Sequence, residues 1–369
     1  MKFFSHIKNV IDFSRLPKSC RRLTFYSESR NYWTHLEGLV KEVLDSSDVI
    51  VTYVSSDEND PGLSFNHPNY LTFLIDEGFV RNWFFENIET DVMVMSMPDI
   101  NQFQVKRSKN NVHYVYVQHS LVSLHMVYRE GAFDFYDTIF CAGPYHLAEM
   151  RAIEVLRNLP KKVLVEHGYS RLDSILVEAK KRVKEEKKSA SLHALIAPSW
   201  GADGTIETGI GIKLVTELLH QGCRVTLRPH PQTIKFNRQE VDAIVHKFSG
   251  NPLFFYENNV AGQNSLHDSD FMISDWSGAA LDYAFGLNKP VMFVDVPRKV
   301  NNTNYQQVDI EPFEVGVRSK IGTIVDVDNL NLAQLKSTLD LDFSTMVYNI
   351  GKSDQVGARH LLDLCGEGK

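Results

Sequence analysis

An arginine and a histidine lie two residues apart, directly after an apolar run, in the stretch VTLRPHP (residues 225–231). The planar guanidinium of Arg228 suits phosphate, and the imidazole of His230 can donate to a phosphate oxygen or move a proton near neutral pH. Pro229 and Pro231 restrict the backbone on both sides of the histidine and hold the two side chains on a stiff turn. These residues predict an anion-binding or proton-transfer site at a strand end, with a solvated loop histidine as the alternative.

A second candidate site lies in the run DFMISDWSGAALDYAFGLNKPVMFVD. The predicted elements are a strand over 271–273, a turn over 274–278, a helix over 279–285 capped by Gly286, and a strand over 291–294. Such a turn lies at the carboxyl end of a parallel strand, where open α/β sheets bind ligands. The free N–H groups at the helix start favour an anion, whereas the alternative is an ordinary βαβ turn without a ligand.

Together these stretches resemble the CDP-glycerol glycerophosphotransferase family of teichoic-acid-type polymer synthesis. That family carries an Arg-x-His-Pro motif, then a Ser/Thr-Asp-x-Ser-Ser turn with an aspartate beyond it and a Lys-Pro pair. The matching residues are 228–231, 274–278, Asp282 and 289–290, with upstream counterparts at 118–120, 166–173 and 197–200. The resemblance runs from about residue 112 to 300. This sequence departs from the family pattern at Gly278, which replaces the second serine, and at Gln118 and Ser120, which replace tryptophan and glycine around His119.

The resemblance implies a GT-B enzyme that transfers glycerol phosphate, or a related polyol or sugar phosphate, from a CDP-activated donor to a hydroxyl of a polymer or lipid-linked acceptor, with release of CMP. It implies no cofactor. His119 is then the candidate base, and Arg228 and His230 neutralise the donor diphosphate. The turn formed by Ser274, Ser277 and Gly278 holds the phosphate, while Asp275 and Asp282 orient the turn or bind donor hydroxyl groups.

Two alternatives remain open at this point. A GT-B glycosyltransferase or a nucleotide-sugar 2-epimerase would bind a nucleotide diphosphate at the same turn but break a sugar C–O bond. The second alternative is a catalytically silent nucleotide-binding partner of a polymer-synthesis complex.

Other ligand-binding motifs are missing from the sequence. No Walker or dinucleotide-binding glycine motif occurs. The acidic pair at 268–270 precedes its strand, opposite the predicted cleft, so we interpret it as a solvated turn and expect no metal site.

The elements that position these residues alternate between strand and helix along the whole chain. This alternation predicts an α/β protein with parallel sheets covered on both faces, here two Rossmann-like doubly wound domains facing a cleft. We expect a basic segment over 1–23, an acceptor-side domain over 24–180, a charged link over 181–192, and a donor-binding domain with a closing C-terminal helix over 193–369. The predicted strands are 23–26, 49–53, 71–74, 92–95, 114–117, 138–140, 163–165, 194–196, 225–227, 253–256, 271–273 and 291–294.

Composition narrows the class of protein further. The 369 residues are 43% hydrophobic and 23% charged, as expected for a globular protein. The net charge of −7 argues against nucleic acid as the main partner. Four widely spaced cysteines predict reduced thiols, and no apolar run reaches the length of a membrane span. We therefore expect a cytoplasmic protein.

The first 23 residues differ in charge from the rest. Six Lys and Arg against Asp12 make this segment basic, and Phe3, Phe4, Ile7, Val10 and Ile11 fall on one helical face. A segment of this kind either lies peripherally on an anionic inner membrane leaflet or docks on the first domain by the same apolar face.

Overall fold

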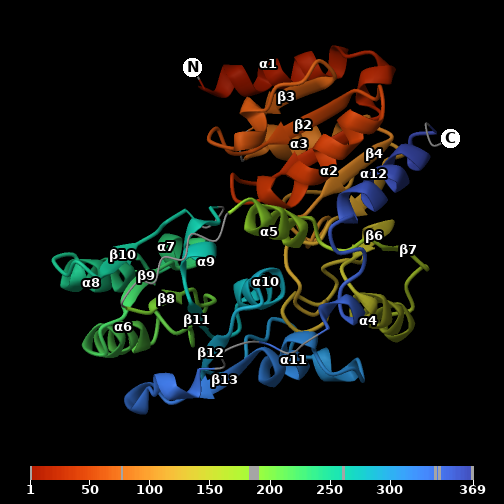
Figure 1. Ribbon diagram of the computed structural model, residues 1–369. Helices are drawn as coiled ribbons and strands as arrows, with labels where there is room; N and C mark the ends of the chain where they lie inside the picture. The colour runs from red at the N-terminus through yellow and green to blue at the C-terminus, as the bar shows by residue number, and fades with distance from the viewer. Residues whose placement is uncertain are drawn as a thin grey trace.

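Two fully parallel β-sheets form the framework of the protein in the computed structural model (Figure 1). The structure describes residues 2–75, 78–182, 191–259, 262–335, 339 and 342–366. The first sheet has the strand order β3-β2-β1-β4-β5-β6-β7 and the second has the order β10-β9-β8-β11-β12-β13. In each sheet the order reverses beside the first strand, which is the doubly wound arrangement. The predicted pair of Rossmann-like domains is therefore confirmed.

The first sheet is built from short strands, and its inner strands are buried because helices cover both of their faces, whereas the edge strands β3 and β7 are partly exposed. Its strands are β1 (Leu23–Ser27), β2 (Val51–Ser55), β3 (Tyr70–Leu74), β4 (Val92–Met95), β5 (His113–Tyr116), β6 (Thr138–Cys141) and β7 (Val163–Glu166). Its helices are α1 (Lys2–Arg15), α2 (Trp33–Ser46), α3 (Phe79–Asn87), α4 (Pro144–Leu156) and α5 (Ser170–Lys181).

The second sheet repeats this plan after the expected link, most of which lies outside the described residues. Its strands are β8 (His193–Ile196), β9 (Arg224–Leu227), β10 (Phe254–Tyr256), β11 (Phe271–Ser274), β12 (Val291–Val294) and β13 (Gly322–Val325). The helices that follow are α6 (Ile210–His220), α7 (Pro231–Phe236), α8 (Arg238–Phe248), α9 (Asn264–Asp268), α10 (Gly278–Leu287), α11 (Phe313–Ile321) and α12 (Ser353–Leu364).

The central β11-α10-β12 unit was predicted with one error, at the end of its helix. Gly286 lies inside α10, and the cap is Asn288, which has a left-handed backbone (φ 53°). Asparagine tolerates that conformation better than most residues, so the helix continues past the glycine.

The last helix crosses back to the first domain. We expected α12 to close the second domain, but it packs against α2 (Figure 1). Its buried residues Ala358 and Leu361 share an apolar cluster with Leu36 and Leu39 of α2. Helix α12 therefore packs on the helices that cover the first sheet.

Helix α1 docks on the first domain, which was one of the two alternatives predicted for the basic segment. Phe13 is 2% exposed, and its ring packs edge-on against Phe73 and Phe84. Asn9 Nδ2 donates to the Leu74 carbonyl at 2.8 Å. Val10 and Phe13 of α1 are thus buried against protein, whereas Ile11 stays 41% exposed.

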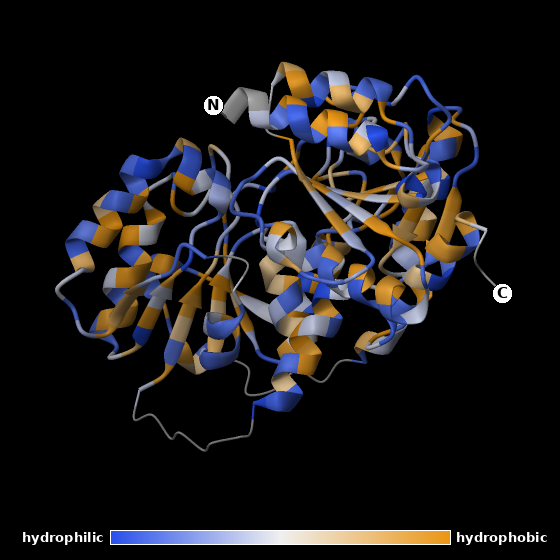
Figure 2. Ribbon diagram, turned by 90° about the horizontal axis from the view of Figure 1, so that it is seen from above, coloured by the Kyte–Doolittle hydropathy of each residue, from blue (hydrophilic) through white to orange (hydrophobic). Residues whose placement is uncertain are grey.

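The two domains share a continuous apolar core. One cluster joins Tyr26 and Met95 of the first domain to Leu281 and Phe285 of α10. Figure 2 shows apolar residues along the strands of both sheets and polar residues on the outer sides of many helices. All four cysteines are free. Within the described ranges, no helix is long and apolar enough to cross a membrane.

Candidate active site in the interdomain cleft

A cleft of about 820 Å³ lies between the two domains and collects the carboxyl ends of several strands. The first domain contributes residues that follow β1, β4 and β5, and the second contributes residues that follow β8, β9 and β11. These are the places where the strand order reverses in each sheet, which is where doubly wound folds bind ligands. The two predicted motifs meet there because β8 lies between β9 and β11.

The lining of the cleft is cationic, although the chain as a whole is acidic. Six Lys or Arg side chains line it against three Asp or Glu side chains. The cations are Arg81, Arg129, Arg171, Arg228, Lys235 and Lys299. The electric field of these cations is concentrated in the cleft and favours the binding of an anionic ligand. Among the described residues, no group of three His, Cys, Asp or Glu side chains could hold a metal ion.

His119 lines the cleft from the first domain, in the loop that follows β5. Its Nδ1 shares a hydrogen bond with the Tyr116 hydroxyl at 3.0 Å, and the rings of Tyr32 and Tyr128 meet it edge-on, each 5.6 Å away between centroids. Burial lowers the pKa of His119 to about 4, opposed only in part by a hydrogen bond to the Ser96 backbone. The ring is therefore neutral at physiological pH, as a proton acceptor must be.

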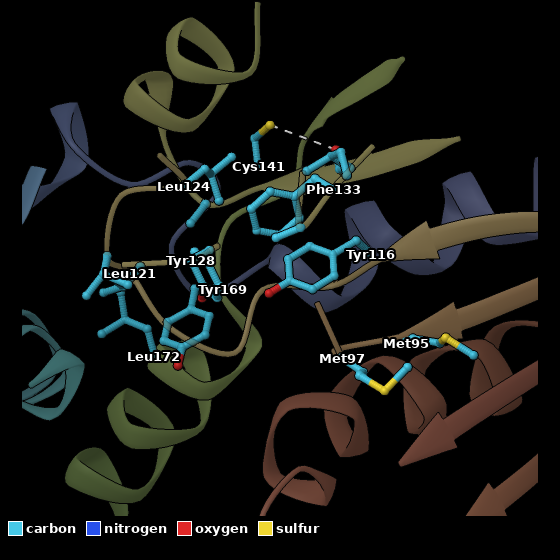
Figure 3. Close-up of a cluster of buried hydrophobic side chains, with 14 of the residues drawn as sticks. Met95, Met97, Tyr116, Leu121, Leu124, Tyr128, Phe133, Cys141, Tyr169 and Leu172 are labelled. Carbon is cyan, nitrogen blue, oxygen red and sulfur yellow. Dashed lines mark hydrogen bonds between the residues drawn. The ribbon is translucent and has the colours of Figure 1, made fainter. Parts of the chain in front are cut away.

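A buried aromatic cluster supports the loop that carries His119. Figure 3 shows Tyr116, Tyr128 and Phe133 packed near Tyr169 and Leu172 of α5, and all five belong to the shared core. The Tyr116 and Phe133 rings lie 4.9 Å apart, which is the edge-to-face range. Rigid packing of this kind holds the histidine in one place.

His230 faces the same cleft from the second domain and caps the short helix α7. Its Nδ1 accepts a hydrogen bond from the Gln232 N–H at 3.1 Å. In the neutral ring the proton must then sit on Nε2, which becomes a donor. Burial, followed by the charge of Lys299, lowers the pKa of His230 to about 3. The two predicted histidines thus come together from opposite domains.

Arg228 lies deep in the cleft and is 5% exposed. Burial, together with the nearby Arg171 charge, lowers its pKa to about 10, so it stays cationic at neutral pH. Asp282 lies close by and accepts from Arg171 Nε at 2.9 Å through Oδ2. This ion pair is buried and joins α5 of the first domain to α10 of the second. The second carboxylate oxygen of Asp282, Oδ1, makes no hydrogen bond to the described residues.

The predicted phosphate turn divides into residues that line the cleft and residues that brace it. Ser277 and Gly278 line the cleft, and Ser277 caps α10 by accepting from the Ala279 N–H at 3.3 Å. Ser274 is fully buried and donates to the Ala197 carbonyl at 2.8 Å. Its side chain is therefore directed away from the ligand side.

Asp275 is likewise turned inward, with 1% of its surface exposed. Its carboxylate accepts from the N–H groups of Ser199 and Trp276, both at 2.6 Å, and from the Thr205 hydroxyl at 2.8 Å. These bonds tie the turn after β11 to the loop after β8. Of the two roles considered for Asp275, the contacts match orientation of the turn.

Arg171, Trp200 and Lys299 also line the cleft but were not among the predicted site residues. Arg171 and Trp200 stand inside motifs that resemble the family, which was the signal available for them. Lys299 has no such signal, and its Nζ lies 4.5 Å from the centre of the Trp200 ring. Burial lowers the pKa of Lys299 to about 8. Trp200 also stacks on His230, with 6.0 Å between ring centroids.

Two Rossmann-like domains that face each other across a cleft form the GT-B fold. Residues 133–300 match the family model described as CDP-Glycerol:Poly(glycerophosphate) glycerophosphotransferase. That match confirms the resemblance over these residues, and the motif at 118–120 lies outside it. Comparison with curated proteins finds no significant match.

Solved structures share the whole fold at low sequence identity. The S. aureus MnaA structure with UDP has a TM-score of 0.60 at 14% identity, covering 94% of this chain and 97% of that one. The Methanocaldococcus jannaschii UDP-GlcNAc 2-epimerase, solved with UDP-GlcNAc and UDP, has a TM-score of 0.58 at 12% identity, covering 93% and 99%. The wall teichoic acid polymerase TagF, as a histidine-to-asparagine variant soaked with CDPG, has a TM-score of 0.56 at 15% identity, covering 99% and 97%. At these identities the likenesses establish the fold.

Proposed function

We propose that this protein transfers a glycerol-phosphate unit, or a related polyol or sugar phosphate, from a CDP-activated donor to a hydroxyl group of an acceptor. The acceptor belongs to a cell-surface polysaccharide or teichoic-acid-like polymer. The observation that carries this proposal is the cationic cleft with His119 and His230 on opposite walls. His230 and the turn at 274–278 belong to the segment that matches the glycerophosphotransferase family, residues 133–300, and His119 precedes that segment. The donor proposed here is an anion with two phosphates, which matches that lining.

The reaction forms one P–O bond and breaks another. The acceptor oxygen attacks the β-phosphorus of the donor, its proton passes to neutral His119, and the bond from the β-phosphorus to CMP breaks. CMP leaves with the electron pair as a phosphate anion and needs no proton. Arg228 and Lys299 stabilise this charge, and the Nε2–H of His230 donates to a phosphate oxygen.

The experiment is a turnover assay with CDP-glycerol and a set of hydroxyl acceptors. We expect CMP release by the wild type and a fall in turnover of ~10²-fold or more for His119→Ala, with little change in donor affinity. Ser46→Ala is the control, because Ser46 is exposed at the end of α2 and does not line the cleft. A His119→Ala enzyme with normal turnover would exclude this histidine as the base.

The alternative of a GT-B sugar enzyme has one specific observation in its favour. Two of the three structures compared are MnaA with UDP and a UDP-GlcNAc 2-epimerase, and they superpose as well as TagF does. Such an enzyme would break a sugar C–O bond. This alternative is supported if the protein releases UDP from a UDP-sugar or epimerises the sugar, and does not release CMP from CDP-glycerol.

We further propose that the protein meets its acceptor at an anionic membrane surface. The polar face of α1 exposes Lys8 and Arg15, and Lys18 follows just beyond the helix. Helix α3 packs against α1 and exposes Phe79 (80%) and Trp83 (51%) one helical turn apart. Exposed aromatic side chains beside basic ones are typical of protein surfaces that lie on anionic lipid.

A further inference from the structure

Gly278 is the first residue of α10, and a residue of the first domain occupies the position that its side chain would need. A Cβ at Gly278 would lie 2.2 Å from Ser120 Oγ and 3.7 Å from Val122 Cγ1. Real Cβ atoms essentially never come this close to another atom, so a side chain at 278 and the Ser120 hydroxyl in its present position exclude each other. Ser120 directly follows His119, and both line the cleft.

The loop that carries Ser120 is fastened to the second domain. Ser123 donates to the Glu314 carboxylate through its N–H at 2.8 Å and through its hydroxyl at 2.9 Å. Further along the loop, Asn302 Nδ2 donates to the His125 carbonyl at 2.9 Å, and the Asn301 N–H donates to the Met126 carbonyl at 3.0 Å. The hydrogen bonds that this loop makes to the second domain therefore hold Ser120 next to α10.

The hydroxyl of Ser120 can act as a donor. The one hydrogen bond that Ser120 Oγ makes to the described residues is accepted from the Val122 N–H at 3.4 Å. Its own hydrogen is thus left for a ligand, since a serine hydroxyl both donates and accepts. The N-terminus of α10, which favours an anion, lies next to it, and the buried cation Arg228 lines the same cleft.

We propose that Ser120 donates a hydrogen bond to the donor diphosphate at the N-terminus of α10, in the place that a serine at position 278 would otherwise hold. The two departures from the family motif, at 120 and at 278, are then one reciprocal exchange between the domains. This inference rests on the proposed function, because it takes the ligand of the cleft to be a nucleoside diphosphate. The first domain would contribute a phosphate-binding group as well as the base.

Four variants test the exchange, with CDP as the probe in calorimetry and CMP release as the second readout. Ser120→Ala should weaken CDP binding about 10-fold or more, the range for a hydrogen bond to a charged group. Gly278→Ser alone should also weaken it, because its Cβ meets Ser120 Oγ. The double variant Ser120→Gly with Gly278→Ser should bind CDP within about 3-fold of the wild type, because the hydroxyl returns without the clash. Ser46→Ala, at an exposed serine outside the cleft, should stay within about 2-fold.

Melting temperatures separate binding from folding, and rescue by the double variant is a result that a purely structural role of Ser120 would not produce. The inference is overturned if Ser120→Ala binds CDP as tightly as the wild type, or if a folded double variant is no better than Gly278→Ser. A wild type that binds CDP without releasing CMP from CDP-glycerol overturns the proposed function alone. If the wild type binds UDP and not CDP, the same variants are compared with UDP. A wild type that binds neither nucleotide overturns both.

Discussion

His230 caps a helix, and that contact determines what the residue can do in the cleft. Its Nδ1 is used by the Gln232 N–H, so Nε2 carries the proton and faces a ligand as a donor. With a pKa near 3 the ring does not pick up a second proton at neutral pH. His119 differs in its partner, because its Nδ1 shares a hydrogen bond with the Tyr116 hydroxyl, and we propose it as the base although both histidines follow a strand in the same way.

Lys299 gives the site a pH dependence that can be predicted. Burial is the main cause of its lowered pKa of about 8, and Asp275 and Glu207 oppose it. Because the folded pKa is depressed, the cation is present below pH 8 and is lost as the pH rises through that value. We expect the Kd for CDP to rise above pH 8, by up to about tenfold per pH unit. Calorimetry between pH 6.5 and 9 measures this.

Lys299→Arg is the control for that profile. Arginine stays charged across the range, so its Kd should remain flat to pH 9. Equal profiles for the lysine and arginine proteins would show that another group is responsible.

For individual residues, the sequence predicted which side chains come together in the cleft, but only in part how each side chain is oriented. Arg228, His230, Ser277 and Gly278 line one cleft with His119, as their positions after strands suggested. Asp275 turns inward because the loop after β8 offers it three hydrogen-bond donors, and that loop is about 75 residues away in the chain. Arg171 pairs with Asp282 over 111 residues. Neither partner can be recognised from local pattern.

Among the elements, the strands were the most predictable. Twelve of them coincide with short apolar runs, because a strand buried on both faces needs apolar residues throughout. Strand β13 was missed because it begins with Gly322 and exposes Ile324 (55%) at the sheet edge. Helix α1 was recognised by its apolar face, but that pattern is the same for a membrane and for a protein surface, and only the docking of Phe13 distinguishes the two.

The docking of α1 determines how its membrane role is tested. Removing the helix would uncover Phe73 and Phe84 and would damage the fold, so charge reversal is the better experiment. We expect Lys8→Glu with Arg15→Glu to reduce sedimentation with anionic vesicles by about tenfold or more, since each basic residue near an anionic surface contributes ~1 kcal/mol. CMP release in solution should stay unchanged.

Neutral vesicles and a Lys213→Glu protein serve as controls, because Lys213 is exposed and lies on α6 of the second domain. Undiminished binding of the α1 variant to anionic vesicles would place the membrane contact elsewhere.

At the scale of the whole molecule, the two domains are bound to each other more firmly than a cleft between them suggests. The Tyr145 and Phe313 rings stack across the interface with centroids 3.9 Å apart. Helix α5 packs on α10, and α12 packs on α2. Because the apolar core is continuous, we expect thermal unfolding in a single transition, and two separated calorimetric transitions would contradict this.

Leu361 tests the contribution of α12. It is fully buried against α2, so Leu361→Ala should lower the free energy of unfolding by ~2–5 kcal/mol in urea denaturation. Arg359→Ala changes an exposed neighbour on the same helix and should stay within ~0.5 kcal/mol. A Leu361→Ala protein as stable as the control would mean that α12 adds little to the first domain.

The return of α12 also bears on how the chain folds while it is being made. Domains usually fold in the order in which they leave the ribosome, the N-terminal one first. Here the outer face of α2 stays uncovered until Ala358 and Leu361 have emerged, after the whole second sheet. The first domain to be translated is then among the last to be completed, and during translation it presents an apolar surface to which a chaperone would bind.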